Sequence, residues 1–263
     1  MALGDETTRD LRQAVRNADC VILCAPLGAY KAIGQAIAGA LKAGAIVSDV
    51  GSVKGAVIAA LEPLLPAHVR LVPAHPVAGT EQSGPDAGFS TLFVNRWCIL
   101  TPPEGSDPKA VEDVRAFWEG LGSHVETMSA AHHDLVLAIT SHVPHLIAYN
   151  IVGTAADLEE AMRSEVIKFS AGGFRDFTRI AASDPTMWRD VFLHNKDAVL
   201  EMLGRFNEDL TALQRMIRRE DGDGLFALFA RTRAIRMGIV AQGQETAAPD
   251  FGRRGNEPSE PAA

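Results

Sequence analysis

Short apolar runs alternate with helical patterns along the first half of the chain. The runs cover residues 20–25, 45–50, 69–73, 97–100 and 124–128. The first two are almost wholly apolar and are bounded by Asp, Pro or Gly, as is typical of strands buried on both faces of a parallel sheet. Helical patterns lie between the runs, at residues 30–41, 53–65 and 108–121. This alternation predicts a layered α/β domain over residues 1–128, with right-handed crossovers.

Past residue 128 the pattern indicates helices alone, so we expect a second, all-helical domain over residues 129–241. Residues 132–156 form a long apolar segment that is interrupted by Pro144. Asp184 and Pro185 are typical of an N-cap and a first helical residue, and we expect their helix to continue to residue 217. A last helix is expected over residues 225–240. These helices carry more apolar surface than one subunit covers, which predicts a homodimer.

Composition narrows the classes of function. The 263-residue chain has a formal net charge of −8, which argues against a surface that binds nucleic acid. Its apolar runs are shorter than a membrane span, and its opening residues are polar and acidic, unlike a signal peptide. The sparse cysteines, Cys20, Cys24 and Cys98, suit a reducing cytoplasm. We expect Cys20 and Cys24 to be buried as small hydrophobic residues, and we expect residues 242–263, rich in Gly, Pro, Glu and Arg, to be disordered.

The first candidate site segment is DVGSVK, residues 49–54, which ends a predicted strand and begins a predicted helix. In an open parallel sheet, ligands bind outside the carboxyl ends of the strands. Gly51 permits close approach of the backbone, and Ser52 is suited to cap the helix while it presents a hydroxyl group. The alternative is an ordinary strand–helix turn, which is a routine connection in α/β proteins.

The second candidate segment is PAHPVAGTEQSG, residues 73–84, which also follows a predicted strand. His75 is therefore expected at the same sheet edge as Ser52. A histidine that is stiffened by Pro76 and followed by glycine and hydroxyl residues is a candidate general base. The alternative is a histidine that serves only as a turn residue.

Two more segments lie in the predicted helical domain. His142 and His145, in ITSHVPH (residues 139–145), share a helix face. Because no HExxH motif or cysteine pair accompanies them, a polar pocket lining is favoured over a metal site. In GGFRDFTRIAASDPTMWRDVF (residues 172–192), Arg175 and Arg179 share a face of a half-buried helix, where arginine usually needs a carboxylate partner. The alternative is a solvated charged face.

One motif match is excluded. Residues 222–227, GDGLFA, fit the dinucleotide-binding pattern GxGxxA. The pattern has this meaning only between a strand and a helix of a βαβ unit, whereas here it follows a charged loop in the helical half.

Taken together, DVGSVK, AHPVAGTEQSG, ITSHVPH and GGFRDFTRIAASDPTMWRDVF resemble the prephenate/arogenate (cyclohexadienyl) dehydrogenases of tyrosine biosynthesis. The segments occur in that family's order and with similar separations, over about residues 10–240. The resemblance implies an NAD(P)-binding Rossmann-like domain joined to a helical dimerisation domain, with the active site between them. It also implies an oxidative decarboxylation, in which hydride passes from a cyclohexadienyl ring to NAD or NADP, CO2 departs and the ring becomes aromatic.

The resemblance assigns roles to single residues. His75 matches the catalytic histidine that takes the substrate's hydroxyl proton, and Ser52 matches the serine that orients this histidine and approaches the nicotinamide. Arg179 matches the arginine that holds a substrate carboxylate. Positions that line the substrate pocket are matched by Thr80, Ser141, His145 and Trp188, and positions at the cofactor by Pro26, Gly51 and Ser52.

The chain departs from the family at its beginning. In the family, a first strand, a GxGxxG turn and a second strand precede the matching region, and we expect this chain to begin after them. A truncated Rossmann-like domain predicts weak dinucleotide binding by the chain as given. One explanation, which we favour, is that the start is misassigned or the fragment artificial and that the full-length protein is an ordinary enzyme. The other is that the chain is truly short and is a remnant that dimerises or binds substrate with poor catalysis. A different class, the β-hydroxyacid dehydrogenases, uses a helical lysine, but neither Lys168 nor Lys196 lies in such a motif.

Overall fold

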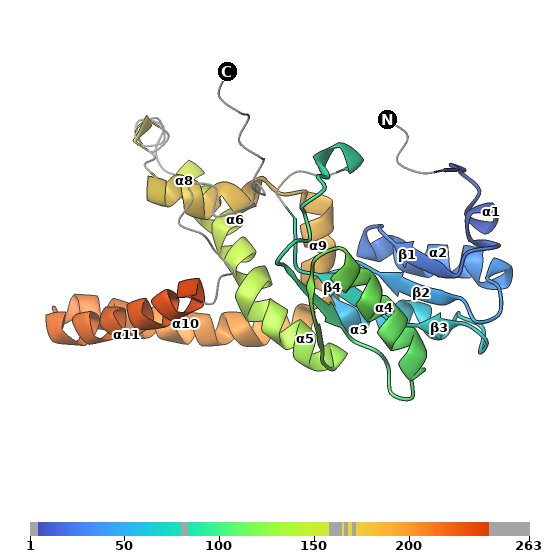
Figure 1. The fold of residues 1–263 in the computed structure, drawn as a ribbon. Helices are drawn as coiled ribbons and strands as arrows, with labels where there is room; N and C mark the ends of the chain where they lie inside the picture. Colours follow the sequence, from blue (N-terminus) through green and yellow to red (C-terminus); the bar gives the residue numbers. More distant parts are fainter. Residues whose placement is uncertain (1–4, 80–83, 158–164, 166–167, 170–171, 242–263) are drawn as a thin grey trace, which may run out of the picture.

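The computed structural model describes residues 5–79, 84–157, 165, 168–169 and 172–241. An α/β half and a helical half lie side by side (Figure 1). The α/β half ends with strand β6 (His124–Thr127), and the helical half begins with helix α5 (Ala130–Leu137). The fold class is therefore the expected one, a Rossmann-like unit followed by a helical unit.

The first sheet is parallel and has the order β1 (Cys20–Leu23), β2 (Ile46–Asp49), β3 (Arg70–Leu71). The connections between its strands contain η1 (Leu27–Ala29), α2 (Tyr30–Ile37), η2 (Ala38–Ala40) and α3 (Lys54–Leu61), and α1 (Leu11–Val15) precedes β1. The core of this sheet includes Tyr30, Ile37, Val47, Val57 and Leu61, all of them almost fully buried. Burial of this apolar surface is the main force that holds α2 and α3 against the sheet.

Strand β1 lies at the edge of the described sheet, which contradicts one expectation about the cysteines. Cys20 and Cys24 are exposed, whereas Cys98 in β5 is buried. An edge strand pairs on one side only, so both of its ends remain open to solvent. The apolar run at residues 20–25 thus predicts the strand correctly but not the burial of its ends.

The second sheet has the order β4 (Ala74–Pro76), β5 (Trp97–Leu100), β6 (His124–Thr127). Strand β4 is antiparallel to β5, and His75 pairs with Ile99. His75 was expected just beyond the end of a strand, but it lies within one. The physical reason is that the chain stays extended after β3 and passes from one sheet to the other: Val72 N donates to Val47 O, and Thr101 N donates to Pro73 O. Helix α4 (Pro108–Gly120) packs on this sheet through Val114 and Trp118, and the short η3 (Pro85–Ala87) precedes β5.

Helix α5 continues through a π-helical turn, η4 (Ala138–His142), into α6 (Val143–Ala156). Pro144 lies in the first turn of α6, just after the wide turn. By length and composition, the continuous helix Ala130–Ala156 is long and apolar enough to cross a membrane, contrary to our expectation from the apolar runs. It nevertheless carries three buried polar side chains, those of His133, Asp134 and His142. His133 and Asp134 contact the α/β half, whereas His142 contacts Asn195 and Trp188 within the helical half.

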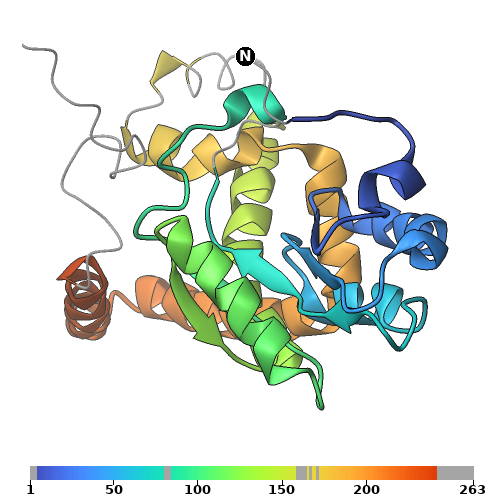
Figure 2. The same cartoon turned by 45° about the vertical axis from the view of Figure 1, so that its right-hand side comes forward.

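Among the described residues, the remaining helices are α8 (Gly172–Thr178), η5 (Arg179–Ala182), α9 (Pro185–His194), α10 (Lys196–Arg218) and α11 (Gly222–Ala241). Asp184 caps α9 as expected, because its side chain accepts a hydrogen bond from Met187 N. The expected continuous helix from Pro185 to residue 217 is interrupted at Asn195, whose backbone leaves the helical range and whose side chain bonds to α5. Figures 1 and 2 show α10 and α11 projecting from the rest of the molecule as a helical hairpin.

Candidate active site between the two halves

A fully buried ion pair fixes the turn that follows β2. Lys54 Nζ lies 2.6 Å from Asp49 Oδ2 and donates to Ala74 O at 2.6 Å, and both side chains are completely buried. Asp49 Oδ1 also accepts from Ala74 N, and Asp49 Oδ2 accepts from Gly51 N. A buried ion pair needs such additional hydrogen bonds to offset its desolvation. The pair therefore fastens the DVGSVK turn to the strand that carries His75.

Three side chains form a hydrogen-bonded chain that begins at His75. His75 Nδ1 lies 2.8 Å from His133 Nε2, and His133 Nδ1 lies 2.8 Å from Asp134 Oδ1. The two imidazole rings meet edge to face, with an interplanar angle of 67°. His75 and His133 are buried, so neither Nδ1 nor the bond between them is open to bulk water. Because Nδ1 of His75 is engaged, Nε2 is the atom left for a reacting group.

Asp134 also caps helix α3, a role that the sequence predicts for Ser52. Its carboxylate accepts hydrogen bonds from Lys54 N and Gly55 N, at the start of α3. The N-cap position of α3 is Val53, and no side chain of the N-cap residue itself caps the helix. The prediction that Ser52 caps this helix is thus wrong, because a carboxylate from α5 satisfies the free N–H groups instead.

Burial sets the protonation of the histidines in the site. Burial lowers the pKa of His75 well below 6.5, and the charges of His133, Lys54 and His142 lower it further. Burial also lowers the pKa of His133, although Asp134 opposes this shift. Burial lowers the pKa of His142 to about 4. At neutral pH the site therefore holds neutral imidazoles, which suits a histidine that has to accept a proton.

The predicted substrate residues of the helical half gather around Trp188 in α9. The His145 ring stacks on Trp188, with ring centroids 3.7 Å apart, and His145 Nδ1 donates to Ser141 O. Burial lowers the pKa of His145, and the guanidinium of Arg179 lowers it further, so Arg179 lies near this ring. The structure thus brings together Ser141, His145, Arg179 and Trp188. Thr80 lies outside the described residues.

Trp188 also connects the helical half to the loops after β1 and β2. It packs with Val53 and Val191, and Leu27 contacts the same cluster. Leu27 follows Pro26, and Val53 follows Ser52. The residues predicted for the substrate and those predicted for the cofactor therefore border the same interface between the two halves. We call this interface, around Leu27, Val53 and Trp188, the seam.

Gly51 has a clear steric reason to be glycine. An added Cβ would lie 2.9 Å from Leu27 Cδ2, which is closer than real Cβ atoms come, and 3.0 Å from Asp49 Oδ2, which is a tight contact. A side chain at this position would therefore require Leu27, the buried Asp49 or the buried Tyr30 to shift. Ser52 beside it is half-buried, and Pro26 is exposed at the end of β1.

Several residues of the site were not found from the sequence. Asn195 Nδ2 donates to Asp134 O and lies 3.1 Å from His142 Nδ1, so it joins α5 to the start of α10. His133 and Asp134 stand in a segment that reads as apolar helix, and only the adjacent polar pair within it marks them. The described residues contain no group of three or more His, Cys, Asp or Glu side chains that could hold a metal ion.

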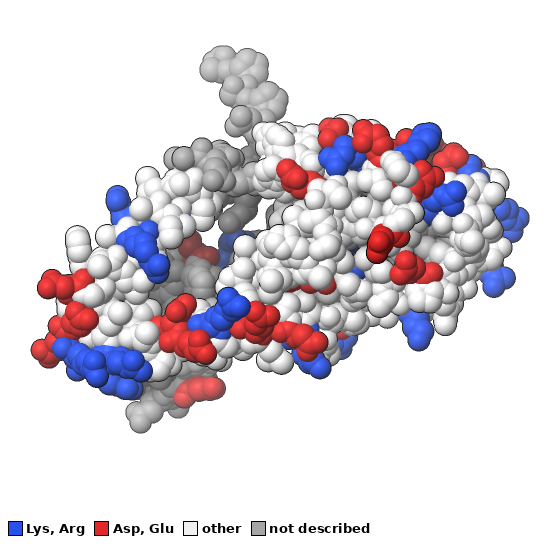
Figure 3. Space-filling model, turned by 90° about the horizontal axis from the view of Figure 1, so that it is seen from below, with Lys and Arg blue, Asp and Glu red and all other residues white. Residues whose placement is uncertain are grey.

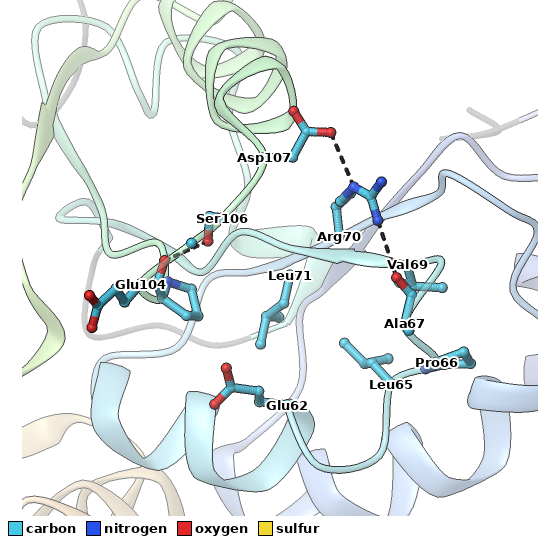
Figure 4. Close-up of a pocket in the computed structure, with 12 residues that line it drawn as sticks. Glu62, Leu65, Pro66, Ala67, Val69, Arg70, Leu71, Glu104, Ser106 and Asp107 are labelled. Atoms are coloured by element: carbon cyan, nitrogen blue, oxygen red, sulfur yellow. Dashed lines mark hydrogen bonds and ion pairs between the residues drawn. The ribbon is translucent and has the colours of Figure 1, made fainter.

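A cavity of about 520 Å³ lies elsewhere (Figure 4). Its lining includes Glu62 at the end of α3, the loop at residues 103–107, and Arg70, which is paired with Asp107. Arg70 begins β3, so this cavity is at the amino-terminal edge of the first sheet, opposite the edge followed by Pro26 and Ser52. Ligands of open α/β sheets bind at the carboxyl edge, and the seam described above lies there.

Comparison with known proteins gives the same picture for both halves. A family model described as the nucleotide-binding domain of prephenate dehydrogenase matches residues 1–127. A second model, described as the dimerization domain of prephenate dehydrogenase, matches residues 129–231. The two matches meet at the boundary between the α/β and helical halves.

Individual relatives agree with these matches. Cyclohexadienyl dehydrogenase of Zymomonas mobilis is 45% identical over 237 residues, which cover 90% of this chain and 80% of that protein. Prephenate dehydrogenase of Bacillus subtilis is 34% identical over 248 residues, which cover 94% of this chain and 66% of that protein. The structure is similar to prephenate dehydrogenase of A. aeolicus in complex with hydroxyphenyl propionate and NAD+, with a TM-score of 0.83, 36% identity, and coverage of 89% of this chain and 82% of that one.

Proposed function

The chain belongs to the prephenate dehydrogenase family, and on that premise we propose that it catalyses the NAD(P)-dependent oxidative decarboxylation of prephenate or arogenate. The observation that carries the proposal is a buried, neutral His75 at the seam between the two halves. Its Nδ1 is already bonded, so its Nε2 is free to act as a base. A small-molecule enzyme of this kind, with exposed cysteines, fits the cytoplasm.

We assign a separate role in the reaction to each residue of the seam. His75 Nε2 takes the hydroxyl proton while hydride leaves the ring carbon that bears this hydroxyl. The bond from the ring to its carboxylate then breaks, CO2 departs, and the electron pair enters the ring, which becomes aromatic. Arg179 holds a carboxylate of the substrate, since a guanidinium binds this group through two parallel hydrogen bonds. His145, Ser141 and Trp188 line the pocket beside it, and we assign Thr80 to the same lining.

The loops after β1 and β2 fit the nicotinamide part of a dinucleotide. Gly51 has no side chain, and its backbone packs close to Leu27 and Tyr30. We infer that this packing holds the turn in place beside Pro26. Ser52 next to it presents a hydroxyl group to the same seam, and we keep it as a residue that approaches the cofactor and His75. Nδ1 of His75 is bonded to His133 rather than to Ser52, so any contact with Ser52 involves Nε2. When bound, the nicotinamide supplies the hydride acceptor.

An assay of the purified chain with four combinations tests this function. Prephenate and arogenate are each offered with NAD and with NADP, and reduced cofactor and released CO2 are measured together. The proposal expects equal amounts of reduced cofactor and CO2 with at least one combination, and the rates decide the preferred substrate and cofactor. Because dinucleotide binding is expected to be weak, each cofactor is raised until the rate no longer increases. The absence of both products from a folded chain under these conditions, with all four combinations, contradicts the proposal and favours a binding remnant.

A further inference from the structure

We propose that His133 and Asp134 are positioning residues that hold His75 in the one neutral tautomer able to act as a base. The contacts between these three side chains determine which nitrogen of each ring carries its proton. The inference rests on the proposed function only for the role of His75 as the base. The arrangement of protons in the resting protein stands apart from that function.

The contacts of the Asp134 carboxylate determine the first proton position. Asp134 Oδ1 accepts from Lys54 N at 2.8 Å, and Oδ2 accepts from Gly55 N at 2.9 Å. Oδ1 therefore faces two nitrogens, Lys54 N and His133 Nδ1, which occupy both of its lone pairs and leave it no proton to donate to the ring. An ionised carboxylate only accepts hydrogen bonds. His133 Nδ1, 2.8 Å from Asp134 Oδ1, must then carry a proton and donate it.

The polarity of the next bond follows from the first. Burial lowers the pKa of His133, so this ring is neutral at physiological pH and has one proton only. With that proton on Nδ1, Nε2 of His133 has a lone pair and can only accept. His75 Nδ1, 2.8 Å away, must therefore be the donor. The remaining nitrogen of His75, Nε2, has no proton and can take one from the substrate.

The same chain stabilises the charge that appears during the reaction. When Nε2 of His75 gains a proton, the ring becomes an imidazolium whose Nδ1–H points at His133. The other titratable groups around the ring are Lys54 and Asp49, which form an ion pair with each other, and His142, which is neutral at neutral pH. Asp134 is thus the carboxylate in line with the new charge, as in a histidine base oriented by an aspartate.

Both positioning residues are themselves held in place from two sides. Asp134 is bonded to the first turn of α3 through its side chain, and its backbone oxygen accepts from Asn195 Nδ2. His133 is completely buried, with an accessible fraction of 0%. It therefore cannot touch a substrate, and its effect has to pass through His75.

Nitrogen NMR of the histidine rings tests the proton positions without any assay of activity. Full-length chain with ¹⁵N-labelled histidine is expected to show His75 protonated on Nδ1 and unprotonated on Nε2 at neutral pH. His133 is expected to have the same tautomer. A wild-type His75 that carries its proton on Nε2 overturns the inference, whatever the activity of the protein.

Two substitutions of His133 separate positioning from mere packing. His133→Gln places a side-chain oxygen near the former Nε2, where it can still accept from His75, whereas His133→Asn reaches only as far as Asp134. We expect His133→Asn to lower kcat about a hundredfold with an unchanged KM, the lower range for loss of a working acid–base group. His133→Gln should recover most of kcat and keep His75 protonated on Nδ1. His132→Asn, at the exposed neighbouring position, is the matched control and should leave kcat and the His75 tautomer unchanged.

Each result of this series is decisive. Equal kcat values for the Asn, Gln and wild-type proteins overturn the inference, and so does a loss that appears only in KM. If His133→Asn fails to fold, the wild-type NMR spectrum and His133→Gln still decide. A wild-type chain with the expected tautomer but no dehydrogenase activity contradicts the proposed function and leaves the tautomer assignment intact.

Discussion

At the scale of single residues, burial does more than charge to prepare the site. Burial of the His75 ring is the largest cause that lowers its pKa, and the neighbouring His133, Lys54 and His142 lower it further. The Lys54–Asp49 pair is equally buried, so its two charges offset each other close to the base. The base is therefore neutral before substrate arrives, and proton transfer creates a positive charge that faces the Asp134 carboxylate through His133.

The pH dependence of kcat/KM follows from this burial. A base works only when it is unprotonated, so its contribution is present above its pKa and is lost as the pH falls through that pKa. Because the pKa of His75 is lowered well below 6.5, we expect kcat/KM to stay on its plateau as the pH falls through 6.5. A steady-state profile measured in buffers of constant ionic strength checks this. An acidic limb centred at or above 6.5 would show that His75 is not the titrating base, or is not buried in the working enzyme.

Arg179 is predicted to act through binding. It is half-buried beside His145, and loss of a charged hydrogen bond to a carboxylate costs about 1.5–3 kcal/mol. We therefore expect Arg179→Ala to raise KM at least about tenfold, with a smaller change in kcat. Arg179→Lys should recover little, since lysine lacks the planar fork. Arg175→Ala, one turn earlier and exposed, is the control, and equal KM values for the two Ala variants would reduce Arg179 to a structural role.

His75, Arg179 and Trp188 could be proposed as site residues from the sequence, because each stands in a segment with a recognisable pattern. His133 could not, because its importance comes from a contact with a residue 58 positions away. The burial of Lys54 could not be predicted either, because lysine is almost never buried without a partner. The local sequence predicts its partner, Asp49, only as part of a turn. Local pattern shows which residues are unusual, whereas tertiary contacts show which of them work together.

At the scale of elements, the site depends on helix ends. Helix α3 begins at the carboxylate of Asp134, and α9 begins at Asp184 and carries Trp188 one turn later. The cap at Asp184 was predictable, because Asp followed by Pro is a local signal. The cap of α3 was not, because its carboxylate comes from another helix 80 residues along the chain. The same limit explains the missed break at Asn195, whose side chain bonds across to α5.

The Asp184 cap gives a prediction about stability. Its side chain accepts from Met187 N at 2.7 Å, and removal of such a cap costs about 1 kcal/mol. We expect Asp184→Ala to lower the thermal unfolding midpoint by about 2–4 °C, as measured by calorimetry. Asp184→Asn keeps an accepting oxygen and should stay within about half of that change. If both variants have the same unfolding midpoint as the wild type, the cap does not contribute to stability.

At the scale of the whole molecule, the helical hairpin of α10 and α11 leaves much apolar surface uncovered. Its exposed large hydrophobic side chains are Leu200, Leu210, Ile217, Phe226, Phe229, Ile235, Met237 and Ile239. Both acidic and basic side chains are present on the face of the molecule shown in Figure 3. The matching family model is that of a dimerization domain. A second copy of the chain is therefore the expected cover.

Dimer formation can be measured directly. Light scattering of the full chain should give twice the mass of one chain, because apolar surface of this extent favours association. Phe226→Asp places a charge on a side chain that is 75% exposed in one chain, and it should shift the mass toward the monomer. Asp113→Ala, on the exposed side of α4, is the control and should not change the mass. A stable, folded wild-type monomer at micromolar concentration contradicts this account.

The account as a whole depends on His75 taking a proton while hydride and CO2 leave the same substrate. The most direct measurement compares wild type and His75→Asn by counting reduced nicotinamide and CO2 together at saturating substrate. We expect equal amounts of both products from wild type, and a turnover at least about a hundredfold lower for His75→Asn with the same substrate Kd. Near-normal turnover by a folded His75→Asn protein would contradict the account, because the seam would then contain a different base.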